Sequence, residues 1–116
     1  MKKILLVDDE ESIHLVYRAE LEEEGYKVHS ALTGEDALQT FKIVSPDLVI
    51  LDINMPGMNG IEVLRQIKEI NPKMPVVLST AYHEYKQELG AWASDYYIIK
   101  SSDLEDLKAA VRQLLS

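Results

Sequence analysis

The sequence predicts an α/β fold, a doubly wound (βα)5 sandwich with a parallel sheet of order 2-1-3-4-5. Short apolar runs alternate with segments of helical character five times along the 116 residues. This alternation is typical of parallel strands joined by right-handed helical crossovers. Polar side chains follow four of the five runs, and the order 2-1-3-4-5 makes those four strand ends neighbours. The length suits one compact domain and is too short for two.

Five apolar runs predict the strands, because four of them are rich in Val, Ile or aromatic residues and stand between polar or turn residues. The second run alternates in part, with Tyr26 and Val28 against Lys27 and His29, which predicts an edge strand. The five runs are Ile4–Val7, Tyr26–Ala31, Leu48–Leu51, Val76–Leu78 and Tyr96–Ile99.

Helix start and stop signals fill the segments between these runs. The first helix is expected over residues 12–24, followed by Gly25, a residue type favoured just after a helix. A weaker fourth helix is expected from about His83 to Gly90. The other signals are Thr33–Asp36 as the cap of the second helix, Asn59–Glu62 opening the third, Asn71-Pro72 ending it, and Ser102–Glu105 as a capping box for the fifth.

The composition excludes several classes of function. Twelve Lys and Arg against twenty Asp and Glu leave a net charge of −8, which argues against direct binding to nucleic-acid phosphates. The absence of Cys excludes disulfides, zinc–thiolate sites, iron–sulfur clusters and cysteine nucleophiles. No apolar run approaches the ~18 residues of a membrane span or the core of a signal peptide. We therefore expect a soluble, cytoplasmic protein without a membrane partner.

The chemistry-bearing side chains collect at the carboxyl ends of the predicted strands. They are Asp8 and Asp9 after the first strand, Asp52 after the third, Ser79 and Thr80 after the fourth, and Lys100 after the fifth. Three carboxylates converging within ~4–5 Å would repel by roughly 4 kcal/mol per pair at an effective dielectric near 20, so the cluster needs a cation. A sparse set of oxygen ligands that leaves water on the metal favours Mg²⁺ over Ca²⁺, with Mn²⁺ as the ion that could substitute.

This arrangement suits phosphoryl chemistry. Phosphoryl transfer needs a nucleophile, a metal that neutralises charge, and hydrogen-bond donors for the remaining oxygens. The Asp52 carboxylate is the expected nucleophile and would form an acyl phosphate. Lys100 can pair with a phosphate oxygen and Thr80 can donate from its hydroxyl group. The loop containing Gly57 and Gly60 permits close approach of the backbone.

These residues together resemble the receiver domain of two-component response regulators, over essentially the whole chain. The matching motifs are Leu5–Glu10, Asp52–Gly60, Ser79–Tyr82 and Asp95–Lys100. The resemblance implies a flavodoxin-like fold. It also implies a single receiver domain over residues 1–116 without an output domain, of the stand-alone type, with no enzymatic turnover of a separate substrate.

The resemblance implies a phosphoacceptor and its metal ligands. Asp52 would accept phosphoryl from the phosphohistidine of a sensor histidine kinase or a histidine phosphotransfer protein. The Mg²⁺ ligands would be the side chains of Asp9 and Asp52 and the backbone carbonyl of Asn54, while Asp8 would act through water.

The resemblance also implies a switch. Thr80 and Lys100 would bind the phosphoryl group, and Tyr97 would change rotamer as Thr80 moves, altering the surface offered to a downstream protein target. Asn54 and Tyr82 flank the site and would tune the lifetime of the aspartyl phosphate.

The sequence departs from the family pattern at two places. Ser101 stands where relatives usually have Pro, often in a cis peptide. A cis bond before Ser would cost ~2.5–4 kcal/mol, so the loop after the fifth strand is expected to take another path. The stretch from Thr80 to Lys100 is also a little short, which predicts a shortened or loosened fourth helix.

Two further groups of residues are open to interpretation. His14, His29 and His83 share no ligand spacing and are expected to be scattered surface histidines. The first helix carries more apolar residues than one buried stripe requires. Either it is broadly buried, or Ile13 and Val16 belong to an exposed strip that docks the kinase.

Two other functions compete with the phosphoacceptor. A small phosphohydrolase with an Asp nucleophile would need a longer chain and a cap over its substrate, and it would release phosphate from a small monoester at steady state. A receiver-like interaction module that is never phosphorylated would ordinarily have lost part of the acidic set or the lysine, and this sequence retains both.

Overall fold

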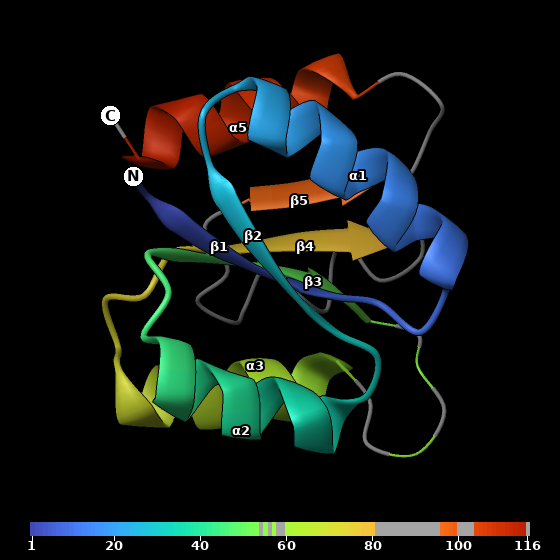
Figure 1. Ribbon diagram of the computed structural model, residues 1–116. Helices are drawn as coiled ribbons and strands as arrows, with labels where there is room; N and C mark the ends of the chain where they lie inside the picture. Colours follow the sequence, from blue (N-terminus) through green and yellow to red (C-terminus); the bar gives the residue numbers. More distant parts are fainter. Residues whose placement is uncertain (54, 56, 58–59, 81–95, 100–103, 116) are drawn as a thin grey trace.

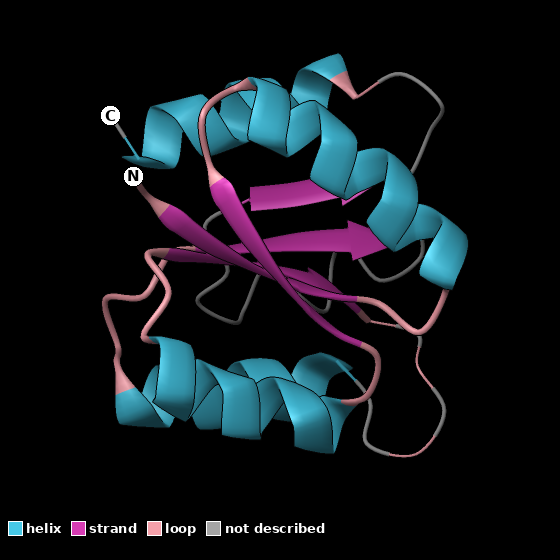
Figure 2. Ribbon diagram, in the orientation of Figure 1, coloured by secondary structure: helices cyan, strands magenta, loops and turns pink. Residues whose placement is uncertain are grey.

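Five parallel strands form one sheet that lies between two layers of helices (Figures 1 and 2). The computed structural model describes residues 1–53, 55, 57, 60–80, 96–99 and 104–115. The strands are β1 (Lys3–Val7), β2 (Lys27–Ala31), β3 (Leu48–Asp52), β4 (Val76–Thr80) and β5 (Tyr96–Ile99). The helices are α1 (Glu11–Glu23), α2 (Gly34–Val44), α3 (Gly60–Ile70) and α5 (Glu105–Leu115).

The strand order is β2-β1-β3-β4-β5, so the predicted fold class and the predicted edge position of β2 are confirmed. All five residues of the central strand β3 are buried, whereas β2 has both exposed and buried residues. Four strands differ from the predicted runs by one or two residues at one end, and β5 has the predicted bounds. The fourth helix expected near His83–Gly90 and the loop after Ser101 lie outside the described residues.

The predicted helix signals act as expected where the structure describes them. Gly25 follows α1 with φ +95°, a conformation that glycine adopts without the penalty of a side chain. The Thr33 hydroxyl oxygen accepts a hydrogen bond from the Asp36 N–H at 3.1 Å and caps α2. The helix α3 ends at Ile70, just before Asn71-Pro72.

Alternation along the strands divides the buried residues into two cores. Leu5 and Val7 of β1 face α2 and α3, whereas Ile4 and Leu6 contribute to a second core with residues of α1 and α5. We call these the α2–α3 core and the α1–α5 core. A strand covered on both faces reads as a continuous apolar run, which is why the runs could be recognised in the sequence.

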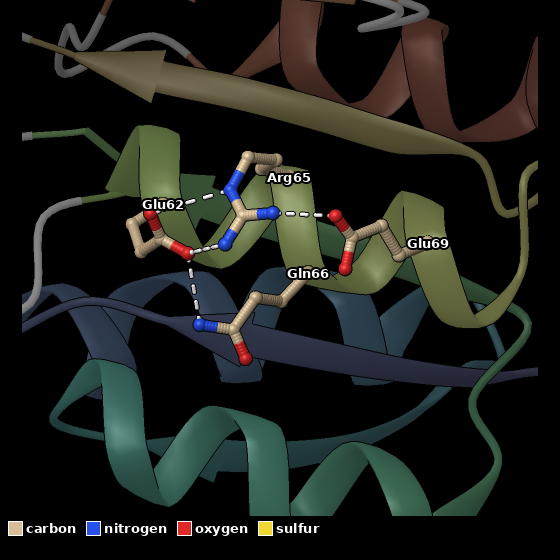
Figure 3. A network of polar contacts seen from close by, with 4 residues as sticks. All are labelled: Glu62, Arg65, Gln66 and Glu69. Atoms are coloured by element: carbon tan, nitrogen blue, oxygen red, sulfur yellow. Dashed lines mark hydrogen bonds and ion pairs between the residues drawn. The ribbon is translucent and has the colours of Figure 1, made fainter.

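The solvent side of α3 carries a network of polar contacts (Figure 3). The Arg65 guanidinium group forms ion pairs with Glu62 and Glu69, and the Gln66 amide donates a hydrogen bond to Glu62 at 2.9 Å. Hydrogen bonds from Arg65 and Gln66 hold the pKa of Glu62 below its usual value, and the same contact with Glu62 raises the pKa of Arg65. These i, i+3 and i, i+4 contacts support the helix on its exposed side.

Among the described residues, no helix is both long and apolar enough to cross a membrane.

Candidate phosphoryl and metal site

The strand register brings the predicted site residues to one edge of the sheet. Val7 of β1 lies opposite Leu51 of β3, so Asp8 and Asp52, each one residue further along, come side by side. Asp52 lies opposite Ser79, and Thr80 lies opposite Ile99. This edge holds the carboxyl ends of the strands, where ligands bind in doubly wound sheets. It is at the right of Figure 1, where β1 leads into α1.

Asp8 is buried and held by hydrogen bonds at three of its atoms. Its N–H donates to the Ala31 carbonyl at 3.1 Å, which continues the ladder between β1 and β2. Its side-chain Oδ1 accepts from the Glu10 N–H at 2.9 Å, and its carbonyl oxygen accepts from His14 Nε2 at 2.7 Å. The position of this carboxylate is therefore set by the sheet, by the following turn and by α1.

Three acidic side chains cluster directly after β1. Carboxylate oxygens of Asp8, Asp9 and Glu10 lie within 4.8 Å of one another, with Asp8 buried and the other two exposed. Like charges at this separation repel, and a divalent cation relieves the repulsion. The donors are all carboxylate oxygens, a set that fits Mg²⁺. Glu10 is not among the predicted metal ligands. Those predictions cover only residues at the ends of strands and residues to which the family resemblance gives a role.

Asp52 ends the central strand with its side chain 3% exposed. The chain after it folds back closely, because the Gly60 N–H donates to the Ile53 carbonyl at 2.9 Å. A Cβ atom at residue 60 would lie 2.2 Å from the Asp52 carbonyl oxygen, so only glycine fits. Gly57 adopts φ +78°, which also favours glycine. The structure shows a close backbone approach of this loop at Gly60, against the end of β3.

The structure describes only some of the other predicted site residues. Thr80 and Tyr97 lie on the neighbouring strands β4 and β5, and the structure describes their backbone. Asn54, Tyr82 and Lys100 lie outside the described residues.

The apolar residues of α1 divide between core and surface. Ile13 is half-buried and packs against the α1–α5 core, whereas Val16 is 53% exposed and its neighbour Leu15 is 75% exposed. The exposed apolar strip on α1 therefore consists mainly of Leu15 and Val16.

The prediction that the histidines are scattered on the surface is wrong for His14. Its side chain is only 8% exposed, and it shares the buried face of α1 with Tyr17 and Leu21. The spacing i, i+3, i+7 of these three residues is the sequence signal that could have placed it. His29 on β2 is half-buried, and His83 lies outside the described residues.

Comparison with known proteins adds independent evidence. A family model described as the response regulator receiver domain matches residues 4–112. The crystal structure of the response regulator protein TrrA from Thermotoga maritima, in complex with Mg²⁺-BeF, superposes with a TM-score of 0.94 at 45% identity, covering 98% of this chain and 99% of that one. TrrA in complex with the histidine kinase ThkA matches with a TM-score of 0.92 and full coverage of both chains.

Curated relatives match the whole chain but differ in length. Sporulation initiation phosphotransferase F of Bacillus subtilis is 36% identical over 98% of this chain and 94% of its own length. The chain spans only a quarter of the regulatory protein AtoC of Escherichia coli and about half of the regulator PhoP of Bacillus subtilis.

Proposed function

This chain belongs to the response regulator receiver domain family, and from that membership we propose that Asp52 is its phosphorylated residue. Receiver domains act in two-component signalling as phosphoacceptors and do not turn over a separate substrate. The observation that carries the assignment is the position of Asp52. It ends the central strand, at the edge of the sheet where Asp8 and the acidic cluster lie.

Phosphorylation at Asp52 is a transfer between two nucleophiles. A carboxylate oxygen of Asp52 attacks phosphorus, the P–O bond forms, and the P–N bond to the donor imidazole breaks. The product is an acyl phosphate. The close return of the backbone at Gly60 fixes the end of β3, so the nucleophile is held in place before the donor arrives.

Asp9 and Asp52 are the side chains proposed to hold Mg²⁺, with the Asn54 carbonyl as a further ligand and Asp8 acting through water. The oxygen donors of the acidic cluster fit this ion, and the similar protein TrrA carries Mg²⁺-BeF. When bound, Mg²⁺ neutralises negative charge on the phosphoryl oxygens and on the carboxylates. The side chain of Glu10 adds negative charge at the same place and strengthens the attraction for a cation.

The remaining predicted roles form part of the same proposal. Thr80 and Lys100 would bind the phosphoryl oxygens, and Tyr97 would follow the movement of Thr80. The register supports this assignment for the backbone, because Thr80 on β4 lies one residue beyond the pair Asp52–Ser79. Asn54 and Tyr82 would set the lifetime of the phosphoryl group.

The proposed phosphoryl donor is a histidine kinase or a histidine phosphotransfer protein. TrrA, at 45% identity, forms a complex with the histidine kinase ThkA. Val16 and the half-buried Ile13 are proposed as docking residues, and the exposure of Leu15 extends the apolar strip. A cytoplasmic location and a downstream protein target stay predictions.

A labelling experiment tests the assignment of Asp52. Incubation with acetyl phosphate and Mg²⁺ should add one phosphoryl group to the wild type and none to Asp52→Asn. Asp47→Asn is a matched control, because Asp47 precedes the same strand at its opposite end, and this variant should be labelled like the wild type. Labelling of Asp52→Asn at the wild-type level would contradict the assignment.

Labelling by a histidine kinase and a phosphate-release assay with a small monoester extend this experiment to the two competing functions. A wild type that takes no phosphoryl from acetyl phosphate or from a kinase would be an interaction module. A wild type that releases phosphate from a small monoester at steady state would be a phosphohydrolase.

A further inference from the structure

His14 is a buried polar side chain that contacts the backbone of Asp8, at the candidate metal site. It lies on α1 and is 8% exposed. Its Nε2 lies 2.7 Å from the carbonyl oxygen of Asp8, six residues earlier in the chain. Within the part of the chain that the structure describes, its buried Nδ1 has no hydrogen-bond partner. An apolar side chain could fill this space, so the bond to Asp8 is what a histidine adds at this position.

The contact determines which nitrogen carries the hydrogen. A carbonyl oxygen only accepts hydrogen bonds, so Nε2 must be the donor, and a neutral ring then leaves Nδ1 unprotonated. At 2.7 Å the bond lies at the short end of the normal range for N–H donors. The side chain therefore holds the Asp8 carbonyl through one well-formed hydrogen bond.

The orientation of this carbonyl matters because it belongs to the peptide unit that joins Asp8 to Asp9. A peptide unit is planar, so fixing the direction of the Asp8 carbonyl also fixes where the N–H and Cα of Asp9 lie. Asp8 is already tied to β2 through its N–H and to Glu10 through its carboxylate. His14 adds the restraint that acts on the link to Asp9.

The start of α1 makes this restraint important. Glu10 occupies the N-cap position, and its side chain makes no capping hydrogen bond to the helix. The carboxylates of Asp8, Asp9 and Glu10 repel one another within 4.8 Å, which favours opening of the turn. The His14 ring, at the end of the first turn of α1, donates a hydrogen bond back to this turn and opposes that opening.

We propose that His14 is a positioning residue that holds the Asp8–Asp9 peptide in the orientation required for Mg²⁺ binding. The inference rests on the proposed function, because it assumes that Asp9 ligates the ion. It does not require His14 to touch the metal or the phosphoryl group. Partners that orient metal ligands in this way commonly change metal affinity by about 10–100-fold when they are removed.

The test compares Mg²⁺ affinity with stability in three variants. His14→Leu removes the donor and keeps the position apolar, whereas His14→Gln keeps an N–H donor on a side chain of similar reach. Leu21→Ala is the matched control, because Leu21 lies on the same buried face of α1, seven residues further along the helix, and belongs to the α1–α5 core. Mg²⁺ dissociation constants are measured by calorimetry at a temperature where each variant is folded, and urea unfolding gives the stability of each.

We expect His14→Leu to weaken Mg²⁺ binding about tenfold. His14→Gln should stay close to the wild type, and Leu21→Ala should keep wild-type affinity although its unfolding midpoint falls. Wild-type affinity in His14→Leu, or equal loss of affinity in Leu21→Ala, would overturn the positioning role and leave the proposed function intact. A wild type that binds no Mg²⁺ would overturn both.

A spectroscopic measurement on the unaltered protein covers the case in which His14→Leu fails to fold. Long-range ¹H–¹⁵N correlation spectra should show the His14 ring protonated at Nε2, with ring signals that shift on saturation with Mg²⁺. A ring protonated at Nδ1 alone, or ring signals indifferent to Mg²⁺, would overturn the inference.

Discussion

Asp47 stands immediately before β3 and Asp52 is its last residue, so two aspartates mark the opposite ends of one five-residue strand. At the amino end, the Asp47 carboxylate accepts a hydrogen bond from the Lys3 N–H at 2.7 Å, and the Asp47 N–H donates to the Lys3 carbonyl at 2.8 Å. The Lys3 ammonium group donates to the Val44 carbonyl at 2.8 Å. This end of the sheet is closed by contacts between β1, β3 and the end of α2.

The carboxyl end of the same strand gathers negative charge instead. Asp52 is buried beside Asp8, and Asp9 and Glu10 follow within the same turn. Similar residues thus stabilise the fold at one end and carry an electrostatic cost at the other. The difference indicates that the acidic end is organised for a cation that arrives later, since Mg²⁺ binding can offset this repulsion.

The largest effect on stability is expected at the carboxyl end of β3, from the substitution Gly60→Ala. The new Cβ would meet the backbone of Asp52 and Ile53 at 2.2 and 2.6 Å, and backbone cannot move aside cheaply. We expect the free energy of unfolding to fall by about 3 kcal/mol, measured in urea. Gly25→Ala is the control, because it has positive φ but open space around it, and it should cost about 1 kcal/mol. Equal losses in the two variants would show that the close approach at Asp52 is unimportant.

Asp47→Ala tests the amino end of β3. It removes the charged acceptor of the Lys3 N–H, and we expect unfolding in urea to show a loss of about 1.5 kcal/mol. Mg²⁺ affinity should be unchanged, because the site lies at the other end of β3. A change in Mg²⁺ affinity in this variant would show that the two ends of β3 do not have independent roles.

Asp9→Asn should act in the opposite direction to Asp47→Ala. Removing one of three clustered charges relieves repulsion, so without Mg²⁺ the free energy of unfolding should rise by about 0.5–1 kcal/mol. Adding Mg²⁺ should stabilise the wild type by an amount that grows with the logarithm of its concentration, and this gain should be lost in the variant. A variant that is less stable than the wild type without Mg²⁺ would contradict the comparison.

The smallest effect concerns pH and His29 on the edge strand. Burial, followed by the charges of Lys27, Lys3 and Arg18, lowers the pKa of His29 from its usual value of 6.5. The unfolded chain therefore binds a proton more readily, and His29 contributes stability above pH 6.5 that is lost as the pH falls toward its lowered value. His29→Gln should flatten the decline in unfolding free energy between about pH 7.5 and pH 5.5. An unchanged slope would show that other groups cause the decline.

The positions of the strands and of most acidic site residues could be predicted from the order of residues along the chain. Buried strands leave continuous apolar runs, and the residues that interrupt burial at strand ends stand out against them, which is why Asp8, Asp52 and Thr80 could be predicted to converge. These signals are local, because each depends on a few neighbouring residues and on the fixed geometry of parallel strands. The same reasoning located Thr33 and Gly25 at helix ends.

The contacts that hold the acidic site, and those that close the opposite end of the sheet, follow from the packing of elements far apart in the sequence. His14 reaches the Asp8 carbonyl because one face of α1 packs onto the sheet, and Lys3 meets Asp47 because β1 and β3 are paired across 44 residues of sequence. Glu10 joins the acidic cluster through the turn between β1 and α1. Such contacts depend on how packed helices and strands orient their side chains toward one another. The order of residues along the chain does not specify this orientation.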